Sequence, residues 1–428
     1  MQSEHFSVTA PSIHVPSSYW LSTAMSSVLS SDLPATIDVA VIGGGLLGTA
    51  ISYWLAKAGV ETVLLEREML AYGATGRNGG FVVAGTAEDY PSAIARLGHE
   101  TAREVTALTF DNRQLLRQAL VEEGIDCDYR EPGSLSLALD ETQLKDMEQA
   151  VILLQMDGFP SALLDRQQVQ ELIKTPLGPE IVGGKFMPEQ GLVHSVKLVQ
   201  GVAKAAQVYG ARLCASNVLQ LMPDSGGVRV LTTQGMLHAA TVVVAVNAWT
   251  SEILPALAGL ITPVRGQVLA YAPMQQIFRT GVSASLSSTG EYWQQALDGT
   301  IVLGGSRDVA PEHDVDVRVS QPSVEVQAAI EQIFPRLFPL LRGLRVVQRW
   351  AGLMAFTLDH LPIVDRVADM SGVWVLGGFS GHGMPFGLRL GQLVATAIAS
   401  GTTPDALRPY RLERSTLAVQ SSGKEKAL

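Results

Sequence analysis

A glycine-rich turn between a buried strand and a helix constrains this chain more than any other feature of its sequence. Residues 37–42 are β-branched and apolar enough for a buried parallel strand. The pattern G-x-G-x-x-G follows at once, with glycines at Gly43, Gly45 and Gly48. The first glycine permits a tight turn, the second lets backbone approach a pyrophosphate, and the third lets the helix pack on the strand. The helix that follows is expected to direct its positive N-terminal end at the phosphates.

A second strand completes this unit. Residues 61–65 are expected to form a strand that ends at Glu66, eighteen residues after Gly48. A carboxylate at this point is expected to accept hydrogen bonds from the ribose hydroxyls of a dinucleotide. The alternative, a glycine-rich turn in an ordinary α/β domain, leaves Glu66 unexplained. The order strand, helix, strand and acid therefore predicts a dinucleotide site.

Length, charge and residue usage narrow the class of protein. The chain is 47% hydrophobic, which is ample for a large buried core, and its length of 428 residues suggests two domains. The net charge of −10, without any run of Lys or Arg, argues against nucleic acid and an anionic membrane as partners. The two cysteines form no C-x-x-C pattern and the eight histidines show no ligand spacing, so no metal site is predicted. The N-terminal residues lack the features of a secretory signal, which predicts a cytoplasmic protein.

The strand and helix patterns alternate between two kinds of domain. We expect an α/β fold: a Rossmann-like parallel-sheet domain that is discontinuous in sequence, and a second α+β domain with a mostly antiparallel sheet. One helix is expected over 90–123 and one strand over 212–221. The expected divisions are an N-terminal arm at 1–31, in which Tyr19 and Trp20 pack on the body, the dinucleotide domain at 32–125, 186–256 and 344–412, the substrate domain at 126–185 and 257–343, and a C-terminal tail at 413–428. The tail is expected to be frayed from about Ser415.

A second glycine cluster lies more than three hundred residues after the first. Residues 377–383 follow a buried strand and precede a final helix. A nicotinamide enzyme usually needs only the first fingerprint, whereas two clusters suggest a long ligand held at both ends. FAD suits this arrangement better than NAD.

The sequence resembles the D-amino-acid oxidase superfamily of FAD enzymes, within it the glycine/sarcosine oxidase and γ-glutamylputrescine oxidase-like branch. Five patches carry the resemblance, and their order is specific for the superfamily. They are 41–48 with Glu66, 73–80, 191–194 with the following helix, 264–267, and 350–352 through 378–383.

The resemblance implies non-covalent FAD and a set of residues that hold it. Gly43, Gly45, Gly48 and Glu66, with Gly44, Leu46 and Leu47 in the same turn, should hold pyrophosphate and ribose, and Arg67 should flank the adenine. Ala74 and Thr75 should reach the pyrophosphate, and Arg77, Asn78, Gly79 and Gly80 should run beside the ring system. Val218 should lie on the strand by the adenine and Asn247 at a turn near the ADP, while Gly378, Gly381, His382, Gly383 and Met384 should open the last helix toward the flavin.

The chain departs from the family pattern where a substrate carboxylate would be held. The segment after Gly381 carries no lysine, Met354 stands where glycine oxidase-like members place an arginine, and no lysine occurs at residues 205–423. The substrate is therefore expected to be an amine, or a molecule whose carboxylate lies far from the reacting carbon. Arg307 is the best remaining candidate for binding an anion; alternatively it is a strand-end arginine paired with Asp308.

Three further residues are candidates at the reacting centre. Tyr292 and Trp293 form either an aromatic wall over the flavin or part of an ordinary core. His382 is a backbone-anchored flavin neighbour or a proton shuttle.

The predicted activity is oxidation of a C–N bond of an amine or N-substituted amino acid. As the family implies, hydride passes to flavin N5 and the resulting imine hydrolyses, with oxygen or another molecule as the electron acceptor. Two alternatives stay open: a flavin dehydrogenase of a hydroxy acid or polyol, and a non-catalytic FAD-binding subunit. The sequence does not define the oligomeric state.

Overall fold

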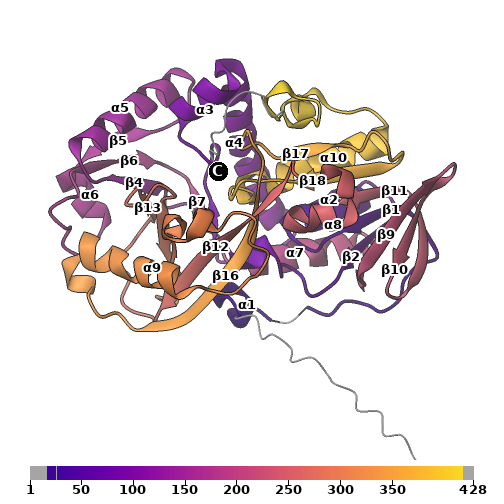
Figure 1. Cartoon of the computed structure of the whole chain (residues 1–428), viewed down its shortest axis with the longest axis horizontal. Coiled ribbons are helices and arrows are strands. Elements are labelled where there is room, and N and C mark those ends of the chain that lie inside the picture. Colours follow the sequence, from indigo (N-terminus) through magenta and orange to yellow (C-terminus); the bar gives the residue numbers. More distant parts are fainter. Residues whose placement is uncertain (1–16, 26, 418–428) are drawn as a thin grey trace, which may run out of the picture.

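The computed structural model describes residues 17–25 and 27–417, and it places two large β-sheets side by side (Figure 1). The sheet on the right of Figure 1 is mostly parallel, and the sheet on the left is mostly antiparallel. Both are built from strands that are dispersed along the chain. This architecture confirms the predicted fold class, a discontinuous Rossmann-like sheet together with a second α+β unit.

The first sheet is organised around β1 (Thr36–Ile42), which pairs in parallel with β2 (Thr62–Glu66) on one side and β11 (Gly235–Val244) on the other. The strand residues on this path are mostly buried, as a parallel sheet covered on both faces requires. The remaining strands are β8 (Arg212–Ala215), β18 (Val373–Gly377), the antiparallel edge strand β17 (Ile363–Arg366) and the hairpin β9 (Val218–Asp224) with β10 (Gly227–Thr232).

The expected strand over 212–221 is two strands. β8 pairs in parallel with β2 and stops opposite Glu66, where β2 itself ends. Ser216 N then donates to Glu66 O at 2.8 Å, and the chain turns away to begin β9. The loss of the pairing partner, which no local pattern reveals, is what divides the strand.

Three helices lie against one face of the first sheet. α2 (Leu46–Lys57) lies between α7 (Ser195–Val208) and α10 (Gly387–Ser400). A Cβ on Gly391 would lie 2.8 Å from the Ala50 Cβ, so the glycine permits a close crossing of α10 over α2.

The expected helix over 90–123 is broken at Gly98. The structure has α3 (Tyr90–Leu97) and α4 (His99–Glu122), and Gly98 ends the first and caps the second with φ +81°. This left-handed conformation cannot continue a helix and favours glycine. α4 has 24 residues, yet neither it nor any other described helix is long and apolar enough to cross a membrane.

The second sheet pairs its strands antiparallel except between β4 and β13, which are parallel. Because the β4 and β13 segments lie far apart in sequence, this pairing joins two parts of the chain. The strands in sheet order are β16 (Val346–Phe356), β12 (Thr262–Tyr271), β15 (Ile301–Gly305), β14 (Glu291–Gln295), β13 (Gly281–Ala284), β4 (Ser134–Ala138), β6 (Gly183–Met187) and β5 (Ala162–Asp165).

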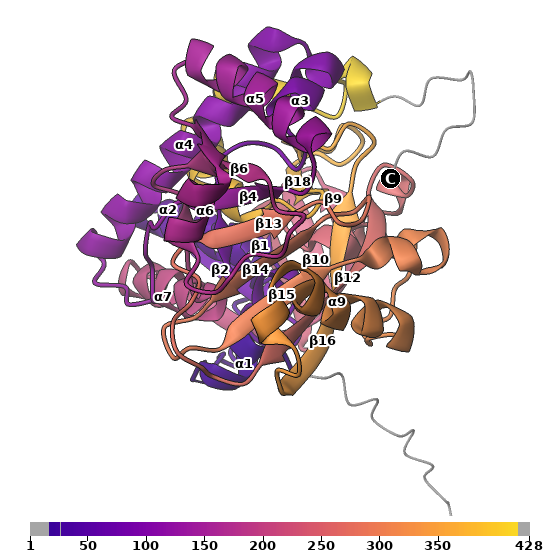
Figure 2. The ribbon, with the colours of Figure 1, turned by 90° about the vertical axis from the view of Figure 1, so that its left-hand side faces the viewer.

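The two faces of the second sheet pack against different helices. On one face, Trp293 and Phe278 join Phe334 and Phe338 in an aromatic core with α9 (Val324–Leu337) and α6 (Arg166–Leu172). α5 (Glu141–Met156) contacts β4 and β6, and Figure 2 shows it above these strands, while α9 lies lower, beside β12 and β15.

β16 belongs to the second sheet. It pairs with β12 along its length, from Thr262 beside Phe356 to Tyr271 beside Val346. The range 344–412 that we assigned to the dinucleotide domain therefore includes one strand of the other sheet. The division into domains otherwise stays a prediction.

The N-terminal arm packs on the body where the structure describes it. Tyr19 and Trp20 of α1 (Tyr19–Thr23) are buried, and the Trp20 indole donates to Asn78 O at 2.7 Å. This confirms the expected packing of both aromatic residues; residues 1–16 lie outside the described part. The short elements nearby are β3 (Phe81–Val82), β7 (Gly191–Leu192) and α8 (Thr250–Ile253).

The start of the C-terminal tail is bonded rather than frayed. Arg414 forms a two-pronged ion pair with Asp359 at 2.6 and 2.9 Å, and the Thr416 hydroxyl donates to Asp359 at 2.6 Å. Asp359 is 1% exposed and Leu417 is buried. Burial alone would raise the pKa of Asp359, but the hydrogen bonds and charge of Arg414 hold it below its ordinary value. The expectation of fraying from residue 415 is wrong up to Leu417, and residues 418–428 are outside the described part.

We expect Asp359→Asn to lower the free energy of unfolding by about 3 kcal/mol, because Arg414 would be left buried without its charge partner. The matched control is Glu104→Gln, which removes an exposed pair with Arg408 and should cost under about 1 kcal/mol. Urea unfolding at several pH values measures both.

Because the pKa of Asp359 is depressed in the folded state, its contribution is complete above the unfolded pKa of about 3.9 and is lost as the pH falls through the folded value. Equal stability losses for the two variants near neutral pH would contradict this account.

Candidate functional site

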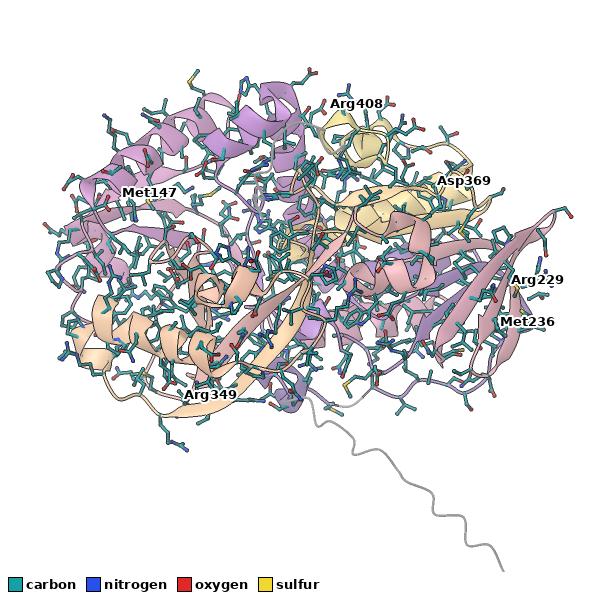
Figure 3. The ribbon with its side chains drawn as sticks, viewed as in Figure 1. Met147, Arg229, Met236, Arg349, Asp369 and Arg408 are labelled. Carbon is teal, nitrogen blue, oxygen red and sulfur yellow. The ribbon has the colours of Figure 1, made fainter. Side chains whose placement is uncertain are left out.

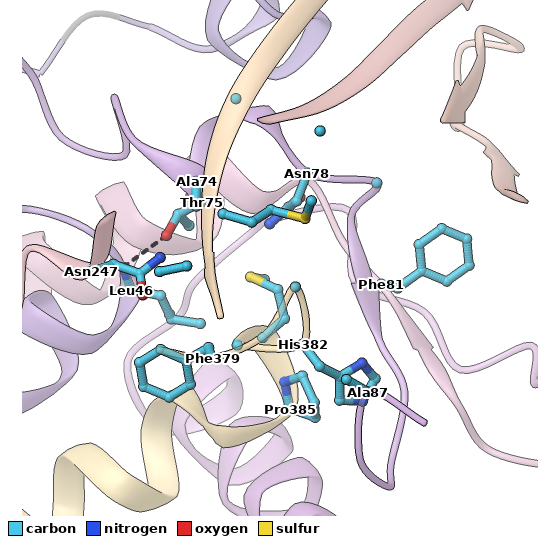
Figure 4. A pocket seen from close by; sticks show the side chains of 18 of the residues that line it. Leu46, Ala74, Thr75, Asn78, Phe81, Ala87, Asn247, Phe379, His382 and Pro385 are labelled. Atoms are coloured by element: carbon cyan, nitrogen blue, oxygen red, sulfur yellow. Dashed lines mark hydrogen bonds between the residues drawn. The ribbon is translucent and has the colours of Figure 1, made fainter. Parts of the chain in front are cut away.

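A cavity of about 1090 Å³ lies between the two sheets. The first sheet contributes the β1–α2 turn and the ends of β2, β11 and β18, while the second contributes β4, β6, β13 and β14. Figure 4 shows part of the wall, with Leu46 and Thr75 near one another and His382 next to Pro385 and Ala87. Segments from the whole length of the chain therefore meet at one site.

The turn between β1 and α2 forms one end of the cavity. A Cβ on Gly48 would lie 1.9 Å from Gly43 O, so the third glycine is required for the helix to approach the strand. Gly45 is the N-cap of α2 and supplies no side-chain acceptor, and the first turn carries no acidic residue. The positive end of the helix is thus directed at the cavity with no acidic residue in its own first turn, which suits a phosphate.

Glu66 is held at the same end by backbone amides. Its carboxylate accepts from Gly44 N at 2.6 Å and from Glu68 N at 2.8 Å. Burial raises the pKa of Glu66, and these two hydrogen bonds act in the opposite direction. The side chain is fixed in orientation and lines the cavity beside Val218 and Arg67.

The second glycine segment borders the middle of the cavity. Its 3₁₀ turn η1 (Ala74–Arg77) places the Thr75 hydroxyl 3.3 Å from Leu46 N, from which it accepts (Figure 4). The Arg77 guanidinium donates to Tyr72 O at 3.0 Å and to Ala351 O at 3.3 Å. Burial lowers the pKa of Arg77, and its bonds to carbonyls from two elements join η1 to β16.

The segment after β18 forms the wall opposite this turn. Asn247, in a left-handed conformation with φ +50°, accepts through Oδ1 from Gly378 N at 3.1 Å. His382 donates from Nε2 to Val83 O at 3.0 Å, and burial lowers its pKa to about 4. The imidazole is therefore neutral at physiological pH. Within the described residues, the amides of Gly383 and Met384 have no hydrogen-bond acceptor, so they are available to a ligand.

The wall next to His382 is uncharged. Met354 and Phe81 line it, and the Tyr292 ring packs against Gly79, where an added Cβ would lie 2.7 Å from the ring. Burial raises the pKa of Tyr292 to about 12, so the phenol stays protonated. The residues described at this end thus offer neutral, mostly apolar surfaces.

Most of the predicted site residues meet at this cavity. Those that line it are Gly43, Gly44, Gly45, Leu46, Leu47, Glu66, Arg67, Ala74, Thr75, Arg77, Asn78, Gly79, Val218, Asn247, Tyr292, Gly381, His382, Gly383 and Met384. Gly48, Gly80 and Gly378 lie behind the wall, where their lack of a side chain allows close packing.

Two candidates for the reacting centre lie elsewhere. Trp293 is fully buried on the opposite face of the second sheet, because successive residues of a strand point to opposite faces. The sequence left open whether Trp293 forms a wall over the flavin or part of the core, and in the structure it lies in the core. Arg307 follows β15, donates to His313 O at 3.0 Å and lies 5.2 Å from the centre of the Phe356 ring. Arg307 does not line the cavity, which corrects the prediction that it is the best candidate for binding an anionic group of the substrate.

The sequence analysis missed Lys185. This residue of β6 is the only lysine that lines the cavity among the described residues. It occurs in a short strand that is rich in glycine. The one available signal was a single cation inside an otherwise uncharged strand.

The fold and site together define a dinucleotide-binding oxidoreductase, with the ligand crevice beyond the carboxyl ends of the parallel strands. Residues 38–397 match the family described as DAO, FAD dependent oxidoreductase. The chain belongs to this family and is an FAD-dependent enzyme. This confirms the superfamily, the enzyme class and the cofactor predicted from the sequence.

Relatives and solved structures agree with this assignment. The chain is 27% identical over 368 residues to a γ-glutamylputrescine oxidoreductase of Escherichia coli, covering 84% of this chain and 83% of the relative. It is similar in fold to the glycine oxidase of Geobacillus kaustophilus, with a TM-score of 0.77, 24% identity and coverage of 89% and 99% of the two chains. The L-proline dehydrogenase of P. horikoshii has a TM-score of 0.76 with 24% identity, covering 90% and 100%.

We expect Glu66→Gln to weaken FAD binding by roughly 5- to 100-fold, because an amide cannot accept from both Gly44 N and Glu68 N and also from a ribose hydroxyl. Titrating the apoprotein with FAD and following quenching of flavin fluorescence measures the dissociation constant. Glu61→Gln, at an exposed residue before β2, is the matched control. Identical constants for the two variants would exclude Glu66 as a cofactor ligand.

Proposed function

We propose that the chain oxidises a C–N bond of an amine or an N-substituted amino acid. The observation that carries the proposal is the neutral wall at one end of the cavity, where Met354, Phe81, Tyr292 and neutral His382 lie together. The names of the γ-glutamylputrescine, glycine and L-proline enzymes point to the same substrate class.

FAD, when bound, supplies the acceptor for the hydride that leaves the carbon next to nitrogen. The cavity fits it at both ends: an α2 N-terminus with no acidic residue in its first turn for the pyrophosphate, and the amides of Gly383 and Met384 for the ring. The cysteines of the chain are buried away from the cavity, which supports non-covalent binding. The residues that would hold FAD are Gly43, Gly44, Gly45, Leu46, Leu47, Glu66, Arg67, Ala74, Thr75, Arg77, Asn78, Gly79, Val218, Asn247, Gly381, His382, Gly383 and Met384.

The protein's own task at the neutral end is to orient the amine and remove its water. Desolvation disfavours an ammonium ion and lowers its pKa, so more of the substrate is present as the reactive free amine. Tyr292 can donate from its hydroxyl, which has no hydrogen-bond partner among the described residues. His382 is held by Val83 O and presents its unprotonated Nδ1 as an acceptor.

The alternatives predicted from the sequence stay as outcomes of the test. A phosphorylated polyol would require clustered cations at the reacting end, where the described wall has Met354 and Phe81. Oxygen and a different electron acceptor are both compatible with the fold, since its relatives include an oxidase and a dehydrogenase. The cytoplasmic location stays a prediction.

The experiment that tests the function is anaerobic reduction of the bound flavin by a panel of amines, amino acids and hydroxy acids, followed by admission of air. We expect loss of visible flavin absorbance with an amine. Rapid return of colour in air identifies an oxidase, and its persistence in the reduced form identifies a dehydrogenase. Reduction by hydroxy acids alone, or by no compound, would overturn the proposal.

We also expect that His382 does not set the pH dependence of the rate of flavin reduction. Because its pKa is lowered to about 4, it is neutral above about pH 5, and the rate of flavin reduction should rise with pH as the substrate ammonium loses its proton. His382→Asn should keep the same inflection. A wild-type inflection near the ordinary histidine pKa of 6.5 that the variant lacks would instead show that His382 moves a proton.

A further inference from the structure

One row of side chains crosses the face of the second sheet that borders the cavity. Strand register places Lys185 of β6 beside Ser136 of β4. Ser136 lies beside Ser283 of β13, and Ser283 beside Tyr292 of β14. All four residues line the cavity, and the Ser283 hydroxyl donates to the Ser136 hydroxyl at 3.0 Å. The row connects the neutral end of the cavity to a lysine.

The row faces the cavity because its neighbours face the opposite side. Leu135, Leu137 and Val282 alternate with the serines and belong to the aromatic core of the second sheet. Lys185 occupies the same face as the serines, not the core. Its position therefore follows from strand pairing between segments that are distant in sequence.

The Lys185 ammonium, at the wall of the cavity, has no acceptor from the residues that the structure describes. The side chain is mostly buried, yet its Nζ forms no hydrogen bond and no ion pair within residues 17–25 and 27–417. Burial lowers the pKa of Lys185, and the charge of Asp89 opposes this shift without forming an ion pair. An ammonium has three donors, and burying it without acceptors costs free energy. A ligand's anionic group would provide the missing acceptors.

The lobe of the cavity above the row is lined by five residues of α5, of which three are apolar and two, Gln143 and the exposed Asp146, are polar. Met147, Ala150 and Leu154 fall on one side of this helix and line the cavity. Figure 3 labels Met147 on the α5 side of the second sheet. The lobe thus offers a mostly apolar roof and a hydroxyl-bearing floor between its two ends, which suits a methylene chain with a polar group at its far end.

The spacing of strands sets the length of such a ligand. Three steps between neighbouring strands separate Lys185 from Tyr292, which is about 14 Å at roughly 4.8 Å per step. The lysine side chain covers part of this distance, which leaves on the order of 10 Å between the lysine ammonium and the Tyr292 position. A carboxylate directly attached to the reacting carbon is too close to be bound by Lys185.

Among the residues that the structure describes, no lysine lies at the reacting end to bind a carboxylate. Met354 stands there, and Arg77 already donates to Tyr72 O and Ala351 O. Lys185 is the cation that remains for the anionic end of a substrate in this part of the cavity.

We propose that Lys185 is a specificity residue that binds a carboxylate about 10 Å from the oxidised C–N bond, so that the substrate is a long amine with an acidic far end. Ser136 and Ser283 provide further donors along the row. The assignment rests on the proposed function, because the amine end of the substrate is placed at the neutral wall.

The test uses the FAD-loaded enzyme with Lys185→Met, Lys185→Arg and the matched control Lys145→Met, which changes an exposed lysine of α5. One probe set is a homologous series of ω-amino acids and n-alkylamines of equal length, read by anaerobic flavin reduction. The other is a series of unreactive n-alkanoates, whose binding is measured by calorimetry and needs no turnover.

We expect the wild type to bind long ω-amino acids better than the matching alkylamines. Lys185→Met should raise the half-saturating concentration of those acids by about 10- to 100-fold while leaving the limiting rate with alkylamines unchanged. Lys185→Arg should recover most of the affinity, and Lys145→Met should behave as wild type. Alkanoates should lose affinity in Lys185→Met by a similar factor.

The outcomes separate this assignment from the proposed function. If alkylamines reduce the flavin but Lys185→Met binds long ω-amino acids and alkanoates as wild type does, the assignment is overturned and the function stands. If no amine reduces the flavin while alkanoates bind in a Lys185-dependent way, the function is overturned and the anion subsite stands. A preference for short α-amino acids that survives in Lys185→Met would also overturn the assignment.

Discussion

The close approach of backbone at the turn between β1 and α2 is the constraint on which the site depends. Only the absence of side chains at Gly43 and Gly48 lets the helix start directly above the strand. This contact directs the N-terminus of α2 at the cavity and sets the position of Gly44, whose amide bonds Glu66. α7 and α10 then pack on the two sides of α2, so the helical layer and the cofactor end of the cavity share one origin.

The second sheet completes the cavity by turning a polar row toward it and an aromatic core away from it. The alternation of strand residues sends Trp293 into that core and Tyr292 to the cavity, although the two are adjacent in sequence. The result is a substrate-binding lobe with different chemistry at its two ends. One end is neutral, where an amine loses its hydration, and the other carries Lys185.

Much of the first domain could be predicted because its signals are local. The strand, glycine pattern, helix and terminal acid that define the cofactor end all lie within thirty residues, and glycine spacing alone indicates where backbone must approach a ligand. Errors occurred where a distant partner decides the outcome. β8 ends where β2 ends, and β16 joins the second sheet because β12 is its partner. The tail that looked frayed is held by Asp359, a residue more than fifty positions away.

The sequence by itself determined the dinucleotide fold, the cofactor class and the positions of the glycines, because these depend on residue spacing along one short segment. The tertiary structure decided which side chains face the substrate. Arg307 lies outside the cavity and Lys185 inside it. Lys185 joins the row of side chains that leads to Tyr292 because the parallel pairing of β4 with β13 aligns segments nearly 150 residues apart. A strand's face is defined by its neighbours in the sheet, and those neighbours are set by packing, not by adjacency in the chain.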